Sequence, residues 1–552
     1  MRVVIATCAP ILSGILLGFG FCDKRYWWFG WLGLIPLHIG LINSKSKIYG
    51  YCGAYLGGLV FFGMGLMFLT RMAEGALIPA YVVIVAGAAT SWMAAALLIT
   101  TVRLPATFGL PVAWVAIEWI RSQLFAMIDG SGLPFLYLGE LQAQCLPLLQ
   151  VADIGGVWAL SWLFATVNGV FCDLLVQISA KPAFFVREAK SYSLMVAIAV
   201  LLSSFLYGSW RLAQNRKREG PVVALVPGFL CPECSPQIEA RQIRQKIAAQ
   251  LNIPDITQRV KRDNTAKWPT LFVWGEHAMP RHTLRFSPPP GAGSEDYAAQ
   301  FIARLARELS STIVVGGFRS DRCLQRSECM RISAFCVDGR GDLIAVVDKF
   351  HLVPGVDFVP NCLQRPVTWM PKLFGLAEVD LAPGVQRGDK AGLAHLKPQD
   401  CDVPVKMGMV VCYDVFFPQV HRRLLRNNNE GDGADFFVGV AYEPWGRECG
   451  FSTYSVIHAQ IRAVEFRRSY CRVSQGGYSV FIDNCGRIQK IRSESDNNIV
   501  VDRMSVDRER TLYAILGDWL PCFCLLGITA NIGRSRFSCR TNQGALVRWW
   551  QP

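Results

Sequence analysis

The chain has 552 residues, of which 52% are hydrophobic and only 18% are charged, and its formal net charge is +14. These values exclude an ordinary water-soluble domain and favour an integral membrane protein with basic cytoplasmic loops. The basic residues are dispersed or lie beside apolar stretches, so they do not form the basic stripe with interleaved aromatic residues that is typical of a nucleic-acid-binding protein.

Apolar residues are concentrated in the N-terminal part of the chain. A membrane helix needs about 20 mostly apolar residues, and seven stretches there qualify. These stretches are 3–21, 26–43, 50–70, 77–101, 105–126, 155–177 and 191–210. Arg2 and the apolar run after it also fit a signal peptide, but further spans follow at once, so we predict that the segment is retained. Residues 1–211 are therefore predicted to form a seven-helix transmembrane domain.

Lysine and arginine in the short loops predict the orientation, since cytoplasmic loops are enriched in them. With the N-terminus in the cytoplasm, the inner loops hold Lys45, Lys47, Arg103, Lys181, Arg187 and Lys190. Seven crossings then place the chain after 211 outside the cytoplasm. A basic group at Arg211, Arg216, Lys217 and Arg218 disagrees with this orientation, but long domains translocate largely regardless of charge.

The apolar stretch at 519–532 predicts an eighth span, although it is short and contains Pro521. Basic residues follow it, as expected of a cytoplasmic tail: Arg534, Arg536, Arg540 and Arg548. Residues 518–552 are therefore predicted to hold the last transmembrane helix and a basic tail. The alternative is a re-entrant or interfacial segment.

Residues 212–517 alternate between strand-like and helix-like stretches. Short β-rich runs lie at 221–228, 270–275, 312–317, 332–337, 342–349, 407–412, 435–441 and 478–483. Polar segments with helical periodicity lie between several of them, at 236–251, 295–309 and 453–468. This pattern predicts an α/β domain with a buried sheet.

The 19 cysteines do not form a metal-spaced set. Cys231 and Cys234 make a lone CxxC without a second pair, so we expect no metal. If this segment lies outside the cytoplasm, the two thiols can form a disulfide; otherwise they are ordinary free cysteines.

Three residues in the α/β domain stand at or just after the end of a predicted strand, where α/β folds gather side chains into a cleft. Glu276 follows "LFVWG" and is a candidate general base. Lys349 follows "LIAVVD" and can stabilise an oxyanion. Cys412 ends "KMGMVVC" and can act as a nucleophile. Taken singly, the three also fit a solvated loop acid, a surface lysine and a buried structural cysteine.

Taken together, these residue types complete one reaction. Glu276 takes the thiol proton, Cys412 attacks an ester carbonyl, and Lys349 with a backbone N–H stabilises the oxyanion. The resulting thioester is open to a second nucleophile.

The longer motifs around these residues resemble the carbon–nitrogen hydrolase (nitrilase) superfamily, and more closely its membrane branch, the apolipoprotein N-acyltransferases. In the α/β domain the resemblance is carried by "KFHLVPGVDFVP" at 349–360, "VCYDVFFPQ" at 411–419, "IRAVEFRR" at 461–468 and "GYSVFIDNCGRI" at 477–488. In the membrane part it is carried by "LPVAWVAIEWIR" at 110–121 and by the segment 133–163.

The resemblance implies an α-β-β-α sandwich on eight membrane helices, with Glu276, Lys349 and Cys412 as catalytic residues. It implies supporting roles for Asp357 and Asp414 and substrate binding at Trp274 and Trp445. The enzyme would hold a fatty acyl chain from a phospholipid on Cys412, releasing a lysophospholipid. It would then pass the chain to the α-amino group of the lipidated, diacylglyceryl N-terminal cysteine of an apolipoprotein.

The resemblance also implies a setting and several expectations about partners. The setting would be the outer face of the inner membrane of a two-membrane bacterium. We expect a monomer, with neither a cofactor nor a nucleic-acid partner. Some positions depart from the family pattern: Gly275 replaces a proline, Asp357 and Asp414 replace glutamates, and Gln475 replaces an asparagine.

Two alternative functions are open: one uses the same three residues and the other uses none of them. A membrane-tethered amidase or nitrilase would use the same three side chains on a small amide, although such a hydrolase does not need seven apolar spans. A catalytically inactive transporter or structural protein would require buried charges within the spans, where only Glu118 and Arg121 occur.

Overall fold

The computed structural model describes residues 2–44, 46–75, 78–102, 104–129, 132–179, 184–214, 218–228, 268–278, 284, 297–322, 328–354, 357–358, 385–389, 392–426, 433–444, 450–493 and 498–547. Some predictions lie outside these residues, namely those for Cys231, Cys234, Trp445 and the helix at 236–251. They stay predictions.

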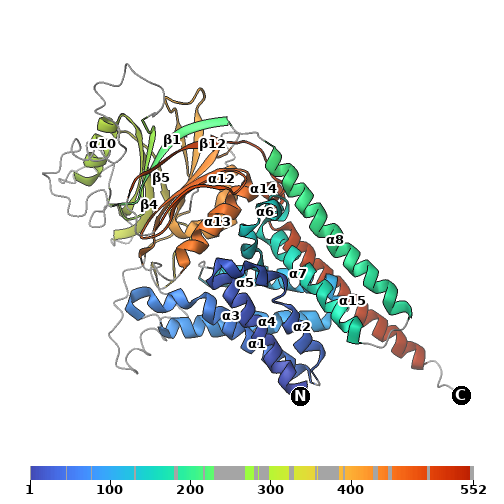
Figure 1. Cartoon of the computed structure of the whole chain (residues 1–552). Coiled ribbons are helices and arrows are strands. Elements are labelled where there is room, and N and C mark those ends of the chain that lie inside the picture. Colours follow the sequence, from blue (N-terminus) through green and yellow to red (C-terminus); the bar gives the residue numbers. More distant parts are fainter. Residues whose placement is uncertain are drawn as a thin grey trace.

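Helices make up the N-terminal part of the chain (Figure 1). In chain order they are α1 (Arg2–Cys22), η1 (Lys24–Trp31), α2 (Ile35–Ile42), α3 (Lys47–Gly65), η2 (Met67–Gly75), α4 (Ile78–Thr101), α5 (Ala106–Asp129), η3 (Leu138–Gln144), α6 (Leu146–Leu149), α7 (Ala152–Ser179) and α8 (Phe184–Ala213), where η marks a 3-10 helix. A last long helix, α15 (Trp519–Val547), follows the sheet domain and lies beside α5 and α7.

Five of the described helices are long and apolar enough to cross a membrane, by length and composition. They are Val3–Cys22, Lys47–Gly65, Ala80–Thr101, Ala152–Val176 and Leu194–Ala213. The apolar part of α15, Trp519–Gly533, is shorter than these. The chain is therefore a multi-pass membrane protein.

The stretch 26–43, predicted as one span, does not form a single helix. It returns along α1 as η1 followed by the short α2, and Gly40 of α2 lies against Pro10 near the middle of α1. The break has a local cause, because Gly30 and Gly33 interrupt the run and Pro36 in the first turn of α2 has no N–H to continue a helix from before it.

The sheet domain holds two six-stranded sheets, with strand orders β12-β1-β2-β3-β4-β5 and β11-β10-β9-β8-β7-β6. The first sheet comprises β1 (Arg218–Val226), β2 (Leu271–Trp274), β3 (Thr312–Arg322), β4 (Glu328–Val337), β5 (Leu343–Asp348) and β12 (Val500–Val506). The second comprises β6 (Leu393–Leu396), β7 (Val405–Val411), β8 (Phe436–Tyr442), β9 (Ser469–Gln475), β10 (Ser479–Ile482) and β11 (Ile488–Arg492). The central strands β1-β2-β3 and β7-β8-β9 pair in parallel.

Side chains from both sheets pack against one another in a shared apolar core, as in a face-to-face sandwich. Strand periodicity assigns the faces. In β2, for example, Leu271 and Val273 face the second sheet, whereas Phe272 and Trp274 pack with α10 (Tyr297–Leu309). On the other side, α12 (Pro418–Leu425) and α13 (Phe451–Phe466) cover the second sheet. The α-β-β-α sandwich predicted from the sequence is confirmed.

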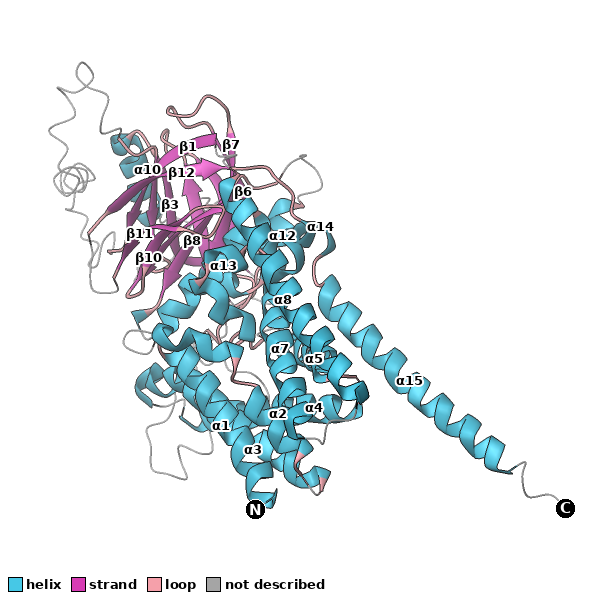
Figure 2. Cartoon of the chain, turned by 45° about the vertical axis from the view of Figure 1, so that its right-hand side comes forward, coloured by secondary structure: helices cyan, strands magenta, loops and turns pink. Residues whose placement is uncertain are grey.

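A single apolar core joins α13 to the membrane helices. It runs from Phe61 of α3 and Trp158 of α7 through Phe416 to Phe451 and Val464 of α13. Figures 1 and 2 show α13 between the sheets and the helical part, with the start of α1 and the end of α15 away from the sheets. The two parts of the chain are thus packed as one body.

A buried ion cluster reinforces this junction. Asp153 at the start of α7 accepts from Arg467, which follows α13, at 2.6 Å and from Arg211 near the end of α8 at 2.9 Å. Arg467 also donates to Gln150 at 2.6 Å. Arg211 and Arg467 thus attach α8 and the end of α13 to the start of α7.

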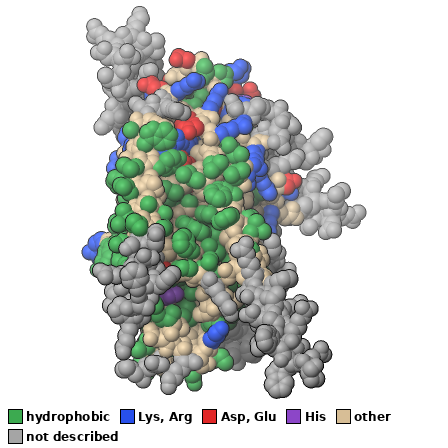
Figure 3. All heavy atoms as spheres, turned by 90° about the vertical axis from the view of Figure 1, so that its right-hand side faces the viewer, with side chains coloured by type: hydrophobic (Ala, Val, Ile, Leu, Met, Phe, Trp, Pro, Cys, Tyr) green, Lys and Arg blue, Asp and Glu red, His purple; other side chains and the backbone are tan. Residues whose placement is uncertain are grey.

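Exposed apolar side chains cover the outer face of the helical part (Figure 3), where hydrophobic groups form a broad band below a charged rim. On α8 and α15 they include Leu194, Ile198, Leu202, Phe205, Leu206, Trp210, Phe523 and Leu526. An apolar surface of this extent on a water-soluble protein would be unstable, and it fits contact with lipid tails.

Candidate active site

Three predicted site residues converge from the ends of three strands. Glu276 follows β2 and Lys349 follows β5, both in the first sheet, whereas Cys412 follows β7 in the second. The Lys349 Nζ atom lies 3.0 Å from Glu276 Oε1, although the two residues are 73 positions apart. Glu276 and Lys349 are each 2% exposed and Cys412 is 6% exposed, so the group is enclosed between the sheets.

Asp357 completes the surroundings of Lys349. Its Oδ2 atom lies 2.9 Å from Lys349 Nζ and also accepts the N–H of Val353 at 2.7 Å. The shorter side chain at this position, compared with the glutamate of the family pattern, still reaches the ammonium. Two carboxylates therefore share one buried ammonium.

This sharing fixes the charge on Lys349. Burial alone would lower the pKa of the ammonium, but the charges of Asp357, Cys412 and Glu276 outweigh burial and raise the pKa well above its ordinary value. Lys349 thus stays protonated and can stabilise negative charge on a substrate oxygen.

Cys412 stands at a strained backbone position. It is the first residue of the 3-10 helix η5 (Cys412–Phe416) and has a φ of +48°, which non-glycine residues rarely adopt. Such strain persists where surrounding contacts enforce it and is frequent at functional sites. The sharp bend from β7 turns the thiol out of the strand, towards Glu276 and Lys349.

The thiol is neutral in the resting site. Burial, the nearby charge of Glu276 and a hydrogen bond to that carboxylate raise the pKa of Cys412 well above its ordinary value. The Glu276 carboxylate, a group that can accept a proton, lies beside this thiol.

Asp414 acts on the lysine loop through its backbone. Its carboxylate accepts the N–H groups of Phe350 and His351 at 2.9 Å each, and it pairs with His351 Nδ1 at 2.8 Å. The His351 ring stacks on Phe417 with centroids 3.6 Å apart. Asp414 thereby ties the loop that carries Lys349 to the loop that carries Cys412, and the aspartate is long enough to do so.

Sequence reasoning did not identify the partner of the second Glu276 oxygen. The N–H of Tyr442, the last residue of β8, donates to Glu276 Oε2 at 3.0 Å. The next residue, Glu443, is buried and accepts from Ser455 at 2.6 Å, from Ser474 at 3.0 Å and from Arg472. A backbone donor has no side-chain signature, so only the fold reveals it.

Of the two predicted tryptophans, Trp274 is the one that lies among the described residues. Trp274 is 1% exposed and packs in the outer core under α10, with its ring 6.0 Å from that of Phe272. Its position serves the core, so substrate binding by Trp274 stays a prediction, as it does for Trp445.

A segment of the membrane part, residues 132–138, forms one wall beside the cysteine loop. The Tyr413 hydroxyl donates to Gly132 O at 3.4 Å, and the Phe135 ring lies 4.6 Å from that of Phe416. The cysteine loop is thus in direct contact with the membrane part of the chain.

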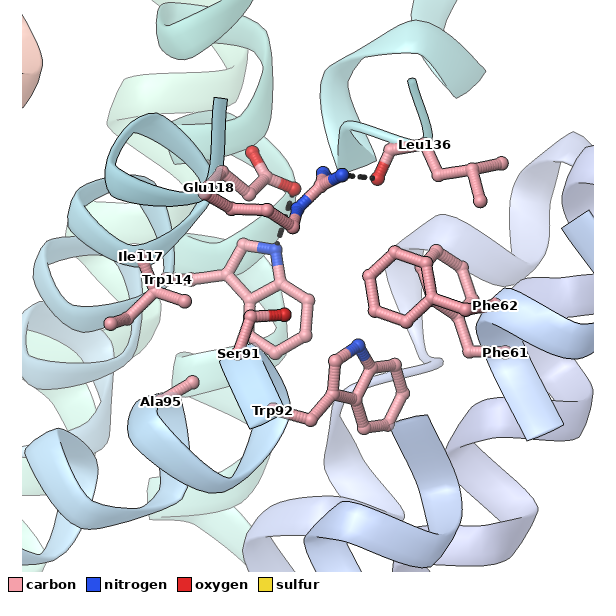
Figure 4. Close-up of a pocket in the computed structure, with 10 residues that line it drawn as sticks. Phe61, Phe62, Ser91, Trp92, Ala95, Trp114, Ile117, Glu118 and Leu136 are labelled. Carbon is pink, nitrogen blue, oxygen red and sulfur yellow. Dashed lines mark hydrogen bonds between the residues drawn. The ribbon is translucent and has the colours of Figure 1, made fainter. Parts of the chain in front are cut away.

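Two charged side chains of α5 hold this wall in place. Arg121 donates to the backbone carbonyls of Phe135 at 2.7 Å and Leu136 at 3.2 Å, and Glu118 accepts the N–H of Leu138 at 2.7 Å. Figure 4 shows Glu118 bonded to Trp114, with Leu136 across the small cavity that these residues line. The predicted pair of charges in this span therefore supports the wall rather than an ion pathway.

The assembled group can carry out nucleophilic acyl transfer. A thiol lies beside a carboxylate that can take its proton, and a fixed ammonium faces the same space. Among the described residues, no cluster of three histidine, cysteine or acidic side chains is arranged to hold a metal ion.

Two family models match the chain. The N-terminal domain of apolipoprotein N-acyltransferases matches residues 13–170, and carbon–nitrogen hydrolase matches residues 267–511. The second match includes Glu276, Lys349 and Cys412.

Curated relatives match across both parts. The chain is 28% identical to an apolipoprotein N-acyltransferase of Geobacter metallireducens over 76% of this chain and 72% of that protein. It is 24% identical to the enzyme of the same name from Methylococcus capsulatus over 98% of both chains, and 22% identical to that of Chlorobaculum tepidum over 96% of both.

Among solved structures, the chain is similar to Nit3 of Saccharomyces cerevisiae, a member of the nitrilase superfamily. The sequence identity is 17% and the TM-score 0.34, over 53% of this chain and 92% of Nit3. An amidase from Nesterenkonia matches with 15% identity and a TM-score of 0.34, over 54% of this chain and 94% of the amidase.

Proposed function

We propose, since the chain belongs to the apolipoprotein N-acyltransferase family, that it moves a fatty acyl chain from a phospholipid to the α-amino group of a lipidated N-terminal cysteine. The observation that most supports this is the contact of Lys349 with both Glu276 and Asp357 beside the Cys412 thiol. The acceptor would be a diacylglyceryl apolipoprotein.

In the first half-reaction, Glu276 takes the proton of Cys412 while the sulfur attacks the ester carbonyl carbon of the phospholipid. Negative charge develops on the carbonyl oxygen, where the Lys349 ammonium stabilises it. The intermediate collapses, the carbon–oxygen ester bond breaks, and the leaving oxygen receives the proton from Glu276. The products are a lysophospholipid and an acyl thioester on Cys412.

In the second half-reaction, the α-amine of the acceptor attacks the thioester carbonyl and Glu276 takes a proton from the nitrogen. The carbon–sulfur bond breaks as the amide forms, and the thiolate recovers its proton from Glu276. Asp357 holds Lys349 in place throughout, and Asp414 keeps the lysine and cysteine loops together.

The membrane part supports this chemistry through the 132–138 wall. Both substrates carry lipid chains, so a cleft beside the membrane helices lets them reach Cys412 without leaving the bilayer. Packing the cysteine loop against an apolar wall also excludes water, which would otherwise hydrolyse the thioester.

We further propose three functional regions and one orientation. Residues 1–211 form the transmembrane domain, 212–517 the catalytic domain, and 518–552 the last membrane helix with a cytoplasmic tail. The catalytic domain faces the periplasm from the inner membrane, and the protein acts as a monomer. The amidase and inactive-protein alternatives are not favoured, because the relatives that match both parts of the chain are named as acyltransferases.

Incubation with a phospholipid that carries an isotope-labelled acyl chain tests this proposal. Mass spectrometry of the digested protein is expected to find the labelled acyl mass on the peptide that contains Cys412, and hydroxylamine should remove it. Adding a diacylglyceryl peptide with a free α-amine should transfer the label to the peptide. Cys412→Ala serves as the control, and an acyl mass that persists in this variant, or that is absent from the wild type, would contradict the proposal.

A further inference from the structure

Gln475, the last residue of β9, forms hydrogen bonds with the turn that carries Glu276. Its Oε1 atom accepts the N–H of His277 at 2.9 Å, and its Nε2 donates to the carbonyl of the same residue at 3.2 Å. Gln475 is 3% exposed, so water does not compete for these bonds. One side chain thus satisfies both backbone groups of the residue that follows Glu276.

Gly275, on the other side of Glu276, leaves the space that this side chain occupies. A Cβ atom at position 275 would lie 2.7 Å from Gln475 Cγ and Oε1, which is closer than van der Waals contact permits. A side chain at position 275 would therefore displace Gln475, whereas the backbone angle at this position is not one that favours glycine. The two residues act as one packed unit.

The backbone of Gln475 reaches the other contact of Glu276. Its carbonyl accepts the N–H of Glu443 at 2.8 Å. Glu443 follows Tyr442, whose N–H binds Glu276 Oε2 at 3.0 Å. The side chain of Gln475 therefore holds the turn below the carboxylate, while its carbonyl holds the strand end that points a donor at the carboxylate.

We infer that Gln475 is a positioning residue for Glu276, and that Gly275 is its obligatory partner because it gives Gln475 room. This inference rests on the proposed function only in taking Glu276 as the proton acceptor of Cys412. Displacing a catalytic group by about 1 Å can cost a factor of ~100 in rate. Loss of the Gln475 hydrogen bonds should therefore slow acylation without unfolding the protein.

Burst kinetics of the full-length protein with a p-nitrophenyl ester test the inference. Release of p-nitrophenol reports acylation of Cys412 whatever the natural acyl donor is. The burst amplitude counts folded sites and the burst rate reports the acylation step. A residue that only stabilises the fold changes the amplitude, whereas a positioning residue changes the rate.

Gln475→Ala and Gly275→Ala are each expected to lower the burst rate about 10- to 100-fold at unchanged amplitude. In the double variant the added methyl group meets no Gln475 side chain, so its rate should equal that of Gln475→Ala alone. A matched control is Gln460→Ala. Gln460 is also buried and donates to backbone carbonyls, those of Gly486 at 2.7 Å and Ala143 at 3.2 Å, but it lies away from Glu276.

Two results would overturn the inference: an unchanged burst rate in Gln475→Ala, or equal rate losses from Gly275→Ala in the presence and absence of Gln475. Should either variant fail to fold, Gln475→Asn, which keeps the amide but shortens its reach, is expected to lower the rate in the same way. If phospholipid leaves no acyl mass on Cys412 while the ester burst still depends on Gln475, the proposed function fails and the inference stands.

Discussion

Two of the buried clusters of charge in the described part of the chain have opposite composition. In the cleft cluster, the two carboxylates of Glu276 and Asp357 share the ammonium of Lys349. In the junction cluster, the guanidinium groups of Arg211 and Arg467 share the carboxylate of Asp153. Both clusters are almost completely shielded from water.

The two clusters differ in whether their carboxylates still have a neighbour with which they can exchange a proton. The donors to Asp153 are Arg467, which follows α13, and two side chains of α8, Arg211 and the Tyr207 hydroxyl at 2.8 Å. Its lone pairs therefore serve to attach these segments to α7. The side-chain oxygens of Glu276 accept from Lys349 and from the backbone N–H of Tyr442, and the Cys412 thiol lies beside them. The same ionic contacts can therefore fasten two parts of a chain or prepare a proton transfer, depending on the neighbour that completes them.

The largest expected effect is on the cleft cluster. Lys349→Met removes the ammonium but keeps a side chain of similar length, so the oxyanion loses its charged partner. We expect acylation of Cys412 to fall about 10⁴-fold, which corresponds to about 5.5 kcal/mol. The ester burst rate measures this loss. A variant that retained a tenth of the wild-type rate would contradict the catalytic role of the cleft cluster.

Breaking the junction cluster should change stability and leave the chemistry intact. Asp153→Asn removes the carboxylate that Arg467 binds, whereas Arg211 keeps Glu509 at 2.8 Å. Removing one partner of a buried ion pair typically costs about 3–5 kcal/mol. We expect a lower Tm in detergent, with an unchanged burst rate per folded site. A drop in that rate at full amplitude would mean that the junction also positions the cleft.

Glu465 of α13 gives the junction a pH dependence. Its Oε1 accepts the N–H of Val157 at 2.9 Å, and burial raises the pKa of this carboxyl to about 7. A carboxyl whose pKa is higher in the folded than in the unfolded protein binds a proton on folding. Its stabilisation is present below its unfolded pKa and is lost as the pH rises through 7, a loss of about 3 kcal/mol.

Thermal unfolding of the wild type between pH 5 and pH 7 tests this, with Glu465→Gln as the variant that cannot titrate. The wild-type Tm should fall with rising pH, and the variant should lack this component. Identical pH dependence in the two proteins would exclude Glu465 as its source.

The smallest effect is expected at the attachment of the last helix. Asp518 accepts from Trp119 at 3.0 Å, from Trp158 at 2.9 Å and from Tyr513 at 2.9 Å, and so links α15 to α5 and α7. Asp518→Asn keeps one acceptor oxygen, so we expect a loss of about 1–2 kcal/mol. A Tm shift as large as that of Asp153→Asn would show that attachment is not concentrated in the junction cluster.

Much of this architecture follows from apolar periodicity. Each of the eight predicted strands coincides with an observed one, because a buried strand is a short apolar run between turn residues. The strands that the pattern misses are β6, β9, β11 and β12. In β9 the buried Arg472 makes the run look polar, since its partner Glu443 lies just after β8 and is distant in the sequence. In β11 all five residues are exposed.

The residues of the candidate site also differ in whether the sequence predicts them. Glu276, Lys349 and Cys412 can be found from the sequence because each directly follows an apolar run. The hydrogen bonds of Gln475, the Tyr442 N–H and the 132–138 wall cannot be found from the sequence, because each depends on contacts between distant segments. The broken second pass at 26–43 also escaped hydropathy, which averages over the glycines and the proline that interrupt the helix.

The apolar core shared by α13, η5 and the membrane helices has a practical consequence. A shortened chain starting near Arg218 would leave the flank of α13 and the Phe416 side of the cysteine loop bare, so it would aggregate rather than yield a soluble catalyst. Enzymology of this protein therefore requires the intact polypeptide in micelles or nanodiscs. Any amphiphile that loosens the helices will also disturb the bend at Cys412.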